Sequence, residues 1–212
     1  MNPYRKLRRF LWRLSVRWLK RGPRFSRYYA YSVLRYVGNN LPNREGRVLA
    51  IGHSEKLAKV LNIKATDSVS ANYPEYNILN LDFPDASFDF VVSDQVLEHV
   101  EGDPFQAVNE CYRVLRPGGI AVHTSSLLIP IHKQKGMGDF WRFTPDAFSL
   151  LHRNWSEIIN VGSWGSRKAF FIMAMDWIRY LPVPKTRIHP LHRLAMKNDL
   201  AWPITVWVVA SK

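Results

Sequence analysis

Two histidines and an aspartate offer the clearest acid–base chemistry in this sequence. His132 lies seven residues before Asp139, in a segment that also holds Gly136 and Gly138. An imidazole with a pKa near neutrality can take a proton from a hydroxyl group, and a nearby carboxylate can orient the ring or act as the base itself. His99 is a second candidate base. We therefore expect His132, Asp139 and His99 to be the catalytic residues.

Metal chemistry is not expected from the sequence. No group of His, Asp or Glu residues shows the spacing of metal ligands along the chain. The single cysteine, Cys111, falls on the apolar face of a predicted helix, where it fills the core, so no disulfide framework is expected. This cysteine usage favours a reducing compartment.

A βαβ unit is the best defined element available to position these side chains. Residues 88–93 form a β-branched and aromatic run, which predicts a buried strand. Residues 104–115 place apolar side chains on one helical face. The sequence Arg-Pro-Gly-Gly at 116–119 ends that helix before a new strand at 120–124. Because a strand, a crossover helix and a strand give parallel pairing, we expect an α/β, doubly wound sheet.

Other short apolar runs predict the remaining strands of this sheet. They are residues 47–52, 62–67, 76–81, 158–161 and 204–210. Ligands of parallel sheets bind at the carboxyl ends of the strands. Gln95, the Glu98–His99 pair and residues 124–126 follow two of these strands directly, so we expect them beside the ligand.

Three sequence blocks in this region resemble those of the class I S-adenosylmethionine (SAM)-dependent methyltransferases. They are FPDASFD at 83–89, VLEHV at 96–100 and RVLRPGG at 113–119. The resemblance is greatest to the small-molecule, type 11 branch. GDFWRFTP at 138–145, with His132 before it, is similar to a block HxxPxDYWRFTP found in a subset often encoded in glycan and cell-envelope pathways. The resemblance implies a Rossmann-like, mostly parallel sheet with an antiparallel last strand, and SAM as the cofactor.

The resemblance also assigns the cofactor site. Gly52, His53 and Ser54 correspond to the turn VLDIGxGxG, in which glycine allows close approach of the main chain to the cofactor. This chain departs from that pattern at Ala50 and Ser54. By the same resemblance, Asp67 would accept hydrogen bonds from the ribose at a strand end. The remaining cofactor residues implied are Asn77, Ile78 and Leu79 beside the adenine, and Asp94 and Gln95 near the methyl group.

The aromatic segment after His132 is a candidate lid. Trp141 could close over the cofactor or acceptor, or could anchor the loop on the core. Arg142 could pair with Asp139 or with an anionic group of the substrate. Both alternatives remain open at this point.

Basic residues are concentrated at the two ends of the chain. Residues 1–44 hold 12 Lys and Arg and no acid, residues 45–163 carry a net charge of −5, and residues 164–212 carry +6. We expect a basic amphipathic helical arm at 1–40 and a methyltransferase-like domain at 41–212. Within that domain we expect a hydrophobic and basic insert at 165–198, read as one apolar helix over 170–181.

Charge of this kind on apolar appendages favours an anionic membrane surface. We therefore expect a cytoplasmic protein, peripheral on the inner face of a membrane, binding through residues 1–37 and through the insert. The insert could instead cover the pocket or form a homodimer. The arm could pack on the domain or bind RNA, although nucleic acid is the weaker alternative because the central region is acidic.

The function implied by the resemblance is SAM-dependent methyl transfer to a small molecule, a sugar or a lipid-linked glycan, with oxygen as the acceptor atom. Two alternatives remain. The altered Ala50 and Ser54 positions suit a catalytically degenerate, membrane-associated scaffold. The basic arm suits an RNA methyltransferase.

Overall fold

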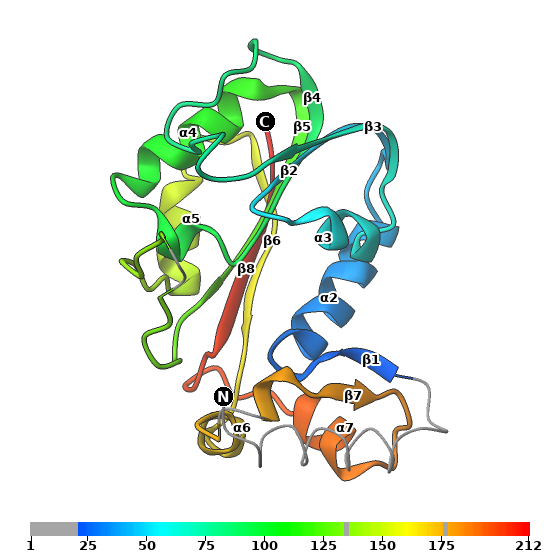
Figure 1. Ribbon diagram of the computed structural model, residues 1–212. Coiled ribbons are helices and arrows are strands. Elements are labelled where there is room, and N and C mark those ends of the chain that lie inside the picture. The colour runs from blue at the N-terminus through cyan, green and yellow to red at the C-terminus, as the bar shows by residue number, and fades with distance from the viewer. Residues whose placement is uncertain (1–20, 134–135, 176–177) are drawn as a thin grey trace.

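A six-stranded sheet forms the centre of the molecule (Figure 1). The computed structural model describes residues 21–133, 136–175 and 178–212. In spatial order the strands are β3 (Lys64–Ala71), β2 (Glu45–Ile51), β4 (Phe88–Asp94), β5 (Leu115–Ser126), β8 (Thr205–Ser211) and β6 (Glu157–Trp164). The pairs β2–β3, β2–β4 and β4–β5 are parallel, whereas β8 is antiparallel to both neighbours. The expected mostly parallel sheet with an antiparallel last strand is confirmed.

Helices cover both faces of the sheet. In Figure 1, α2 (Tyr28–Asn39) and α3 (Glu55–Val60) lie on one side, and α4 (Pro104–Val114) and α5 (Pro145–Leu151) lie on the other. Alternate residues of one strand serve the two cores: Val48 and Ala50 pack toward α2 and α3, while Leu49 and Ile51 pack toward the α4 and α5 side. This period of two explains why the parallel strands read as continuous apolar runs.

Short polar sequences start the helices of the α4 and α5 side. The Asp103 side chain accepts a hydrogen bond from Phe105 N at the start of α4, and Thr144 accepts one from Ala147 N at the start of α5. Each helix has proline in its first turn, where no main-chain donor is needed. The expected βαβ unit and the expected helix after Thr144 are both present.

The strand expected at 76–81 is wrong. This segment consists of turns closed by an isolated bridge between Asn77 and Asn80. The Asn77 side chain accepts a hydrogen bond from Leu79 N, which stabilises a turn in place of an extended strand.

The apolar insert is divided, so the expectation of one helix over 170–181 is also wrong. It contains α6 (Arg167–Met173), the short 3-10 helix η3 (Ile178–Tyr180), β7 (Pro182–Pro184) and α7 (Pro190–Ala195). β7 pairs with β1 (Arg21–Arg24), and Figure 1 shows this small sheet with α6 and α7 grouped at one end of the large sheet.

The described part of the 1–40 segment belongs to the core of the domain. Residues 25–27 form a 3-10 helix (η1), and α2 follows without a break. Phe25, Tyr31 and Leu34 are buried, and the Phe25 ring meets Trp164 of β6 edge to face, with 5.4 Å between centroids. The amphipathic helix expected at 1–20 lies outside the described residues. Within the described ranges, no helix combines the length and apolar character that a membrane crossing requires.

Two buried histidines lie between the sheet and α5. His123 of β5 has Nδ1 2.7 Å from Ser93 Oγ, and His152 has Nδ1 2.8 Å from the Phe148 carbonyl oxygen. Their rings are 5.4 Å apart. Burial, followed by the nearby His152, holds the pKa of His123 well below 6.5. Burial also lowers the pKa of His152 to about 4, despite the opposing hydrogen bond to Phe148. Both rings are therefore neutral in the folded protein.

These two histidines should make the protein less stable as the pH falls below 6.5. Between that value and the folded-state pKa of about 4, the unfolded chain binds more protons at His152 than the folded chain. The free energy of unfolding should fall by about 1.4 kcal/mol per pH unit per histidine in this window. Chemical denaturation at several pH values measures it.

His152→Gln isolates one of the two contributions. Burial raises the pKa of Glu98, so this carboxyl makes the protein more stable as the pH falls. The informative quantity is therefore the difference in free energy of unfolding between the wild type and the variant. This difference should shrink as the pH falls. A difference that does not change with pH would contradict the assignment.

Candidate functional site

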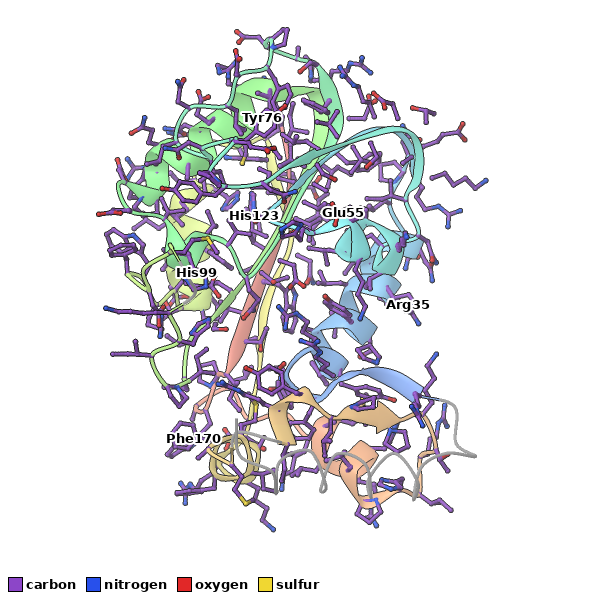
Figure 2. The ribbon with its side chains drawn as sticks, in the orientation of Figure 1. Arg35, Glu55, Tyr76, His99, His123 and Phe170 are labelled. Atoms are coloured by element: carbon purple, nitrogen blue, oxygen red, sulfur yellow. The ribbon has the colours of Figure 1, made fainter. Side chains whose placement is uncertain are left out.

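A cavity of about 590 Å³ lies at the carboxyl ends of β2, β4 and β5, a volume in the usual range for small-molecule sites. Segments far apart in the sequence line it, including the end of β1, the turn after β2, the loop after β3, η2 (Leu97–His99), the loop at 136–140 and η3. The expected position of the ligand at the strand ends agrees with this cavity. Figure 2 labels His99 on the side of the sheet where α4 and α5 lie.

The turn after β2 brings the main chain to the cavity. Gly52 and His53 both have left-handed backbone conformations, with φ of 66° and 60°. Gly52 N donates to the Ala71 carbonyl oxygen at 3.0 Å, and His53 N donates to Asn72 Oδ1 at 2.8 Å. A Cβ atom on Gly52 would lie 2.6 Å from a methyl carbon of Val96. Glycine is thus required here both by the backbone angle and by the space beside Val96.

The Ser54 side chain does not face the cavity, which corrects its expected contact with the cofactor. It is buried, its hydroxyl donates to the Ile51 carbonyl oxygen, and it accepts a hydrogen bond from Asp94 N at 2.7 Å. Ala50 is also buried, in the core on the α2 side. Of the two departures from the glycine-rich pattern, Ala50 therefore packs in the core, and Ser54 joins the end of β2 to the end of β4.

Asp67 is in the wrong place for the expected ribose contact. It lies in the middle of β3, opposite Arg47, with which it forms an exposed ion pair of 2.8 Å. The strand continues to Ala71, four residues beyond the expected end. The polar residue that reaches the cavity from this strand is Asn72.

Asn77, Ile78 and Leu79 line the cavity, in agreement with their expected place. They do so from a turn, in which the side-chain oxygen of Asn77 accepts a hydrogen bond from Leu79 N at 3.0 Å. Together with Ile51, Ala71 and Val96 they give this end of the cavity a largely apolar wall.

Asp94 ends β4 and joins three elements at the edge of the cavity. Its Oδ2 atom accepts hydrogen bonds from Arg27 Nε at 2.8 Å and from the Tyr31 hydroxyl at 2.5 Å, and its Oδ1 atom accepts one from Thr124 Oγ1 at 2.7 Å. Burial, followed by the Asp94 charge, raises the pKa of Tyr31. Sequence reasoning missed the contribution of Arg27 and Tyr31 to the site, because Asp94 lies 67 and 63 residues after them in the chain.

Gln95 follows in a left-handed conformation with φ of 63°. Its amide donates to the Thr124 carbonyl oxygen at 3.0 Å, and its side-chain oxygen accepts a hydrogen bond from Ser126. Asp94 and Gln95 both line the cavity, so the structure brings them to their expected place.

His99 and His132 give the cavity a polar lining, and their ring centroids are 4.9 Å apart. Glu98 lies behind them, fully buried, with Oε2 accepting a hydrogen bond from Ser125 at 2.8 Å. Burial lowers the pKa of His132 despite the opposing charge of Asp139, and His99 and Arg142 add to the decrease. His132 is therefore neutral at pH 7.

Asp139 positions His132 and does not reach the cavity itself. Its buried carboxylate accepts a hydrogen bond from His132 N at 2.8 Å and pairs with both terminal nitrogens of Arg142. The Arg142 bonds hold the pKa of Asp139 well below its usual range. Of the two alternatives for Arg142, pairing with Asp139 is the one observed.

Trp141 anchors the loop, which is the second of the two alternatives that the sequence left open for it. Its indole Nε1 donates to the Val100 carbonyl oxygen at 2.9 Å, and the residue lies outside the cavity lining. The Phe140 and Trp141 amides both donate to the Glu98 carbonyl oxygen. Of the two aromatic neighbours Phe140 and Trp141, Phe140 is the one that lines the cavity.

The insert also contributes to the lining. Met173, Arg179 and Tyr180 meet Arg24 and Ser26 there, so the β1–β7 end of the molecule closes one side of the cavity. The sequence allowed an insert that covers the pocket, but the pairing of β1 with β7 gave no local signal because their partners are about 160 residues apart.

Comparison with known proteins finds methyltransferases that match the central part of this chain. A family model described as a methyltransferase domain matches residues 33–123. A probable S-adenosylmethionine-dependent methyltransferase of Mycolicibacterium smegmatis is 51% identical over 57 residues, which are 24% of this chain and 22% of that protein. A demethylmenaquinone methyltransferase of Listeria monocytogenes is 39% identical over 94 residues, which are 42% of this chain and 39% of that protein.

A solved structure has the same fold. The crystal structure of an S-adenosylmethionine-dependent methyltransferase from Mesorhizobium loti matches with a TM-score of 0.56 and 14% identity, covering 88% of this chain and 98% of that chain. The chain spans 22% and 39% of the lengths of the two curated relatives. The matched family segment contains β2 to β4, the Gly52 turn, Asp94 and His99. Over this central segment the chain is similar to methyltransferases in sequence, and its sheet has the fold of the class I SAM-dependent methyltransferases.

Proposed function

We propose that this chain binds SAM in the cavity and transfers its methyl group to an acceptor hydroxyl beside His99 and His132. The observation that carries the proposal is the left-handed Gly52–His53 turn, which lies at the carboxyl end of β2 and opens onto the cavity. When bound, SAM would supply an electrophilic methyl group.

The residues present fit such a cofactor. The turn beside the cavity depends on the absent side chain of Gly52, whose Cβ atom would collide with Val96. Asn72 offers a side-chain amide in place of the ribose carboxylate, and its Nδ2 atom can donate to a hydroxyl group. The apolar wall at Ile78 and Leu79 suits a flat base, and Gln95 lies toward the acceptor end.

The acceptor end needs a group that takes up a proton. In methyl transfer to oxygen, the C–O bond forms as the C–S bond breaks, its electron pair stays on sulfur, and the hydroxyl proton must leave. The neutral ring of His132 lines the cavity, and Asp139 holds the main chain of this residue, so His132 is the proposed proton acceptor. Orientation of the acceptor by the rigid loop at 138–142 would supply the alignment that such a displacement requires.

The acceptor class we propose is a sugar or a lipid-linked glycan at a membrane surface. The basic ends of the chain support it, since residues 1–20 hold seven Lys and Arg and no acid. A demethylmenaquinone-like acceptor is the second candidate, favoured by the Listeria relative's name. RNA and a purely structural role are outcomes that the experiments below would reveal.

Gly52→Ala should weaken SAM binding at least about tenfold, because the added methyl group meets Val96 and strains a left-handed position. Isothermal titration calorimetry measures the affinity. Gly118→Ala is the matched control, since Gly118 also has a left-handed φ, of 76°, but has open space around it and lies outside the cavity. Equal loss in both variants, or no binding by the wild type, would contradict the site.

His132→Ala should lower the rate of methyl transfer by about 100-fold, the usual contribution of a positioned base, while SAM affinity stays within a few-fold. Transfer of labelled methyl from SAM to separated glycan, lipid and RNA fractions of a cell extract measures both the rate and the acceptor. Label in RNA alone would reject the glycan proposal, and SAM binding without any transfer would support the scaffold alternative.

Removal of residues 1–20 should reduce binding to vesicles that contain anionic lipid, because seven cationic side chains are lost. Vesicle sedimentation measures it, with neutral vesicles as the control. The truncation must stop before Phe25, since the residues from there through α2 are part of the core. Undiminished binding would move the anchor to the insert.

A further inference from the structure

Three side chains beside the cavity have buried polar atoms without hydrogen-bond partners among the described residues. They are Glu98 Oε1, His99 Nε2 and His132 Nδ1. Each of these residues offers one ligand atom, and the three ligand atoms lie within 4.8 Å of one another. The spacing along the chain does not predict this cluster, because η2 supplies two members and a loop more than 30 residues later supplies the third.

The neighbours of the cluster hold its members in the orientation of ligands. His99 Nδ1 lies 2.6 Å from the Gly138 carbonyl oxygen, so Nδ1 carries the proton and Nε2 keeps a free lone pair. Asp139 lies beside the His132 ring, with Oδ2 3.4 Å from Nδ1. Ser125 binds the other oxygen of Glu98. The carbonyl group behind His99 is the usual support of a metal-binding imidazole, whereas Asp139 lies on the side of the unpartnered His132 nitrogen.

The buried Glu98 carboxyl is only partly compensated by the side chains that the structure describes. Glu98 is fully buried, and its Oε1 atom has no donor. The nearby guanidinium of Arg142 is taken up by Asp139, and that of Arg27 by Asp94. A buried carboxylate without a donor is costly, and a divalent cation is one way in which proteins compensate it.

We propose that Glu98, His99 and His132 bind a divalent transition-metal cation. Two imidazoles and one carboxylate suit Zn²⁺, Mn²⁺, Fe²⁺ or Co²⁺, whereas Mg²⁺ and Ca²⁺ prefer oxygen ligands alone. Because His99 and His132 line the cavity, the remaining coordination positions would face it. Three protein ligands with an open position is the arrangement of a catalytic rather than a structural site.

The role of the cation rests on the proposed methyl transfer, although its binding does not. A hydroxyl group bound to the cation becomes more acidic and is fixed beside the methyl donor. His132 would then act through the cation as a ligand, and the hydroxyl proton would leave to solvent. Activity would depend on the metal.

Titration of chelator-treated, dialysed protein with Co²⁺ tests the binding directly. We expect visible d–d absorption bands that saturate at one ion per chain and are displaced by Zn²⁺. Glu98→Gln and His132→Gln should each weaken Co²⁺ binding at least about tenfold, since even supporting residues of metal sites contribute that much. His192→Gln, a histidine outside the cluster, is the matched control and should bind like the wild type.

No saturating Co²⁺ spectrum in the wild type, or equal binding by the His132→Gln variant, would overturn the proposal. Circular dichroism establishes that each variant is folded. If Glu98→Gln does not fold, His132→Gln decides the outcome. SAM titration of the metal-free wild type separates the two proposals: SAM binding without any cobalt site rejects the metal and leaves His132 as the base, whereas a cobalt site without SAM binding rejects the proposed function and keeps the metal site.

Discussion

The carboxylate of Asp94 is the interaction on which the rest of the site depends. It sits at the carboxyl end of β4, where Arg27 and Tyr31 reach it from the N-terminal helical segment and Thr124 reaches it from β5. Its own amide is fastened through Ser54 to the turn after β2. A mostly buried charge of this kind is stable only with such partners. The requirement fixes η1 and α2 against the strand ends and so builds one wall of the cavity.

The parts of the fold that could be predicted are those with strong local patterns. Residues 88–126 predict a strand, a capped helix and a strand, because their apolar periods and their Asp-Pro and Pro-Gly-Gly boundaries indicate the same three elements. Where local patterns were weak, the predictions failed. β3 is mostly exposed, so no apolar run marked its end, and the predicted end at Asp67 was four residues too early. The turn at Asn77 uses a side-chain hydrogen bond that strand propensity does not reveal.

The site was harder to predict than the fold because its members meet only in three dimensions. His132 and His99 were recognised singly, as candidate bases, and Glu98 was noticed only as a neighbour of His99. What makes them a cluster is the loop at 138–142, which the Phe140 and Trp141 amides and the Trp141 indole bind to η2. Trp141, which could have closed over the ligand or anchored the loop, holds this loop in place. Spacing along the chain could not show which of the two it would do.

The turn after β2 departs from the family's glycine pattern without any change in its backbone requirements. The family's second glycine is Ser54 here, which in the sequence argued for a degenerate enzyme. Yet Ser54 has φ of −92°, an ordinary value for an L residue, and the left-handed positions of the turn are Gly52 and His53. Serine therefore costs no backbone strain at this position, and its hydroxyl adds the link to Asp94. The turn keeps the one glycine that its geometry requires, so the substitution does not argue against cofactor binding.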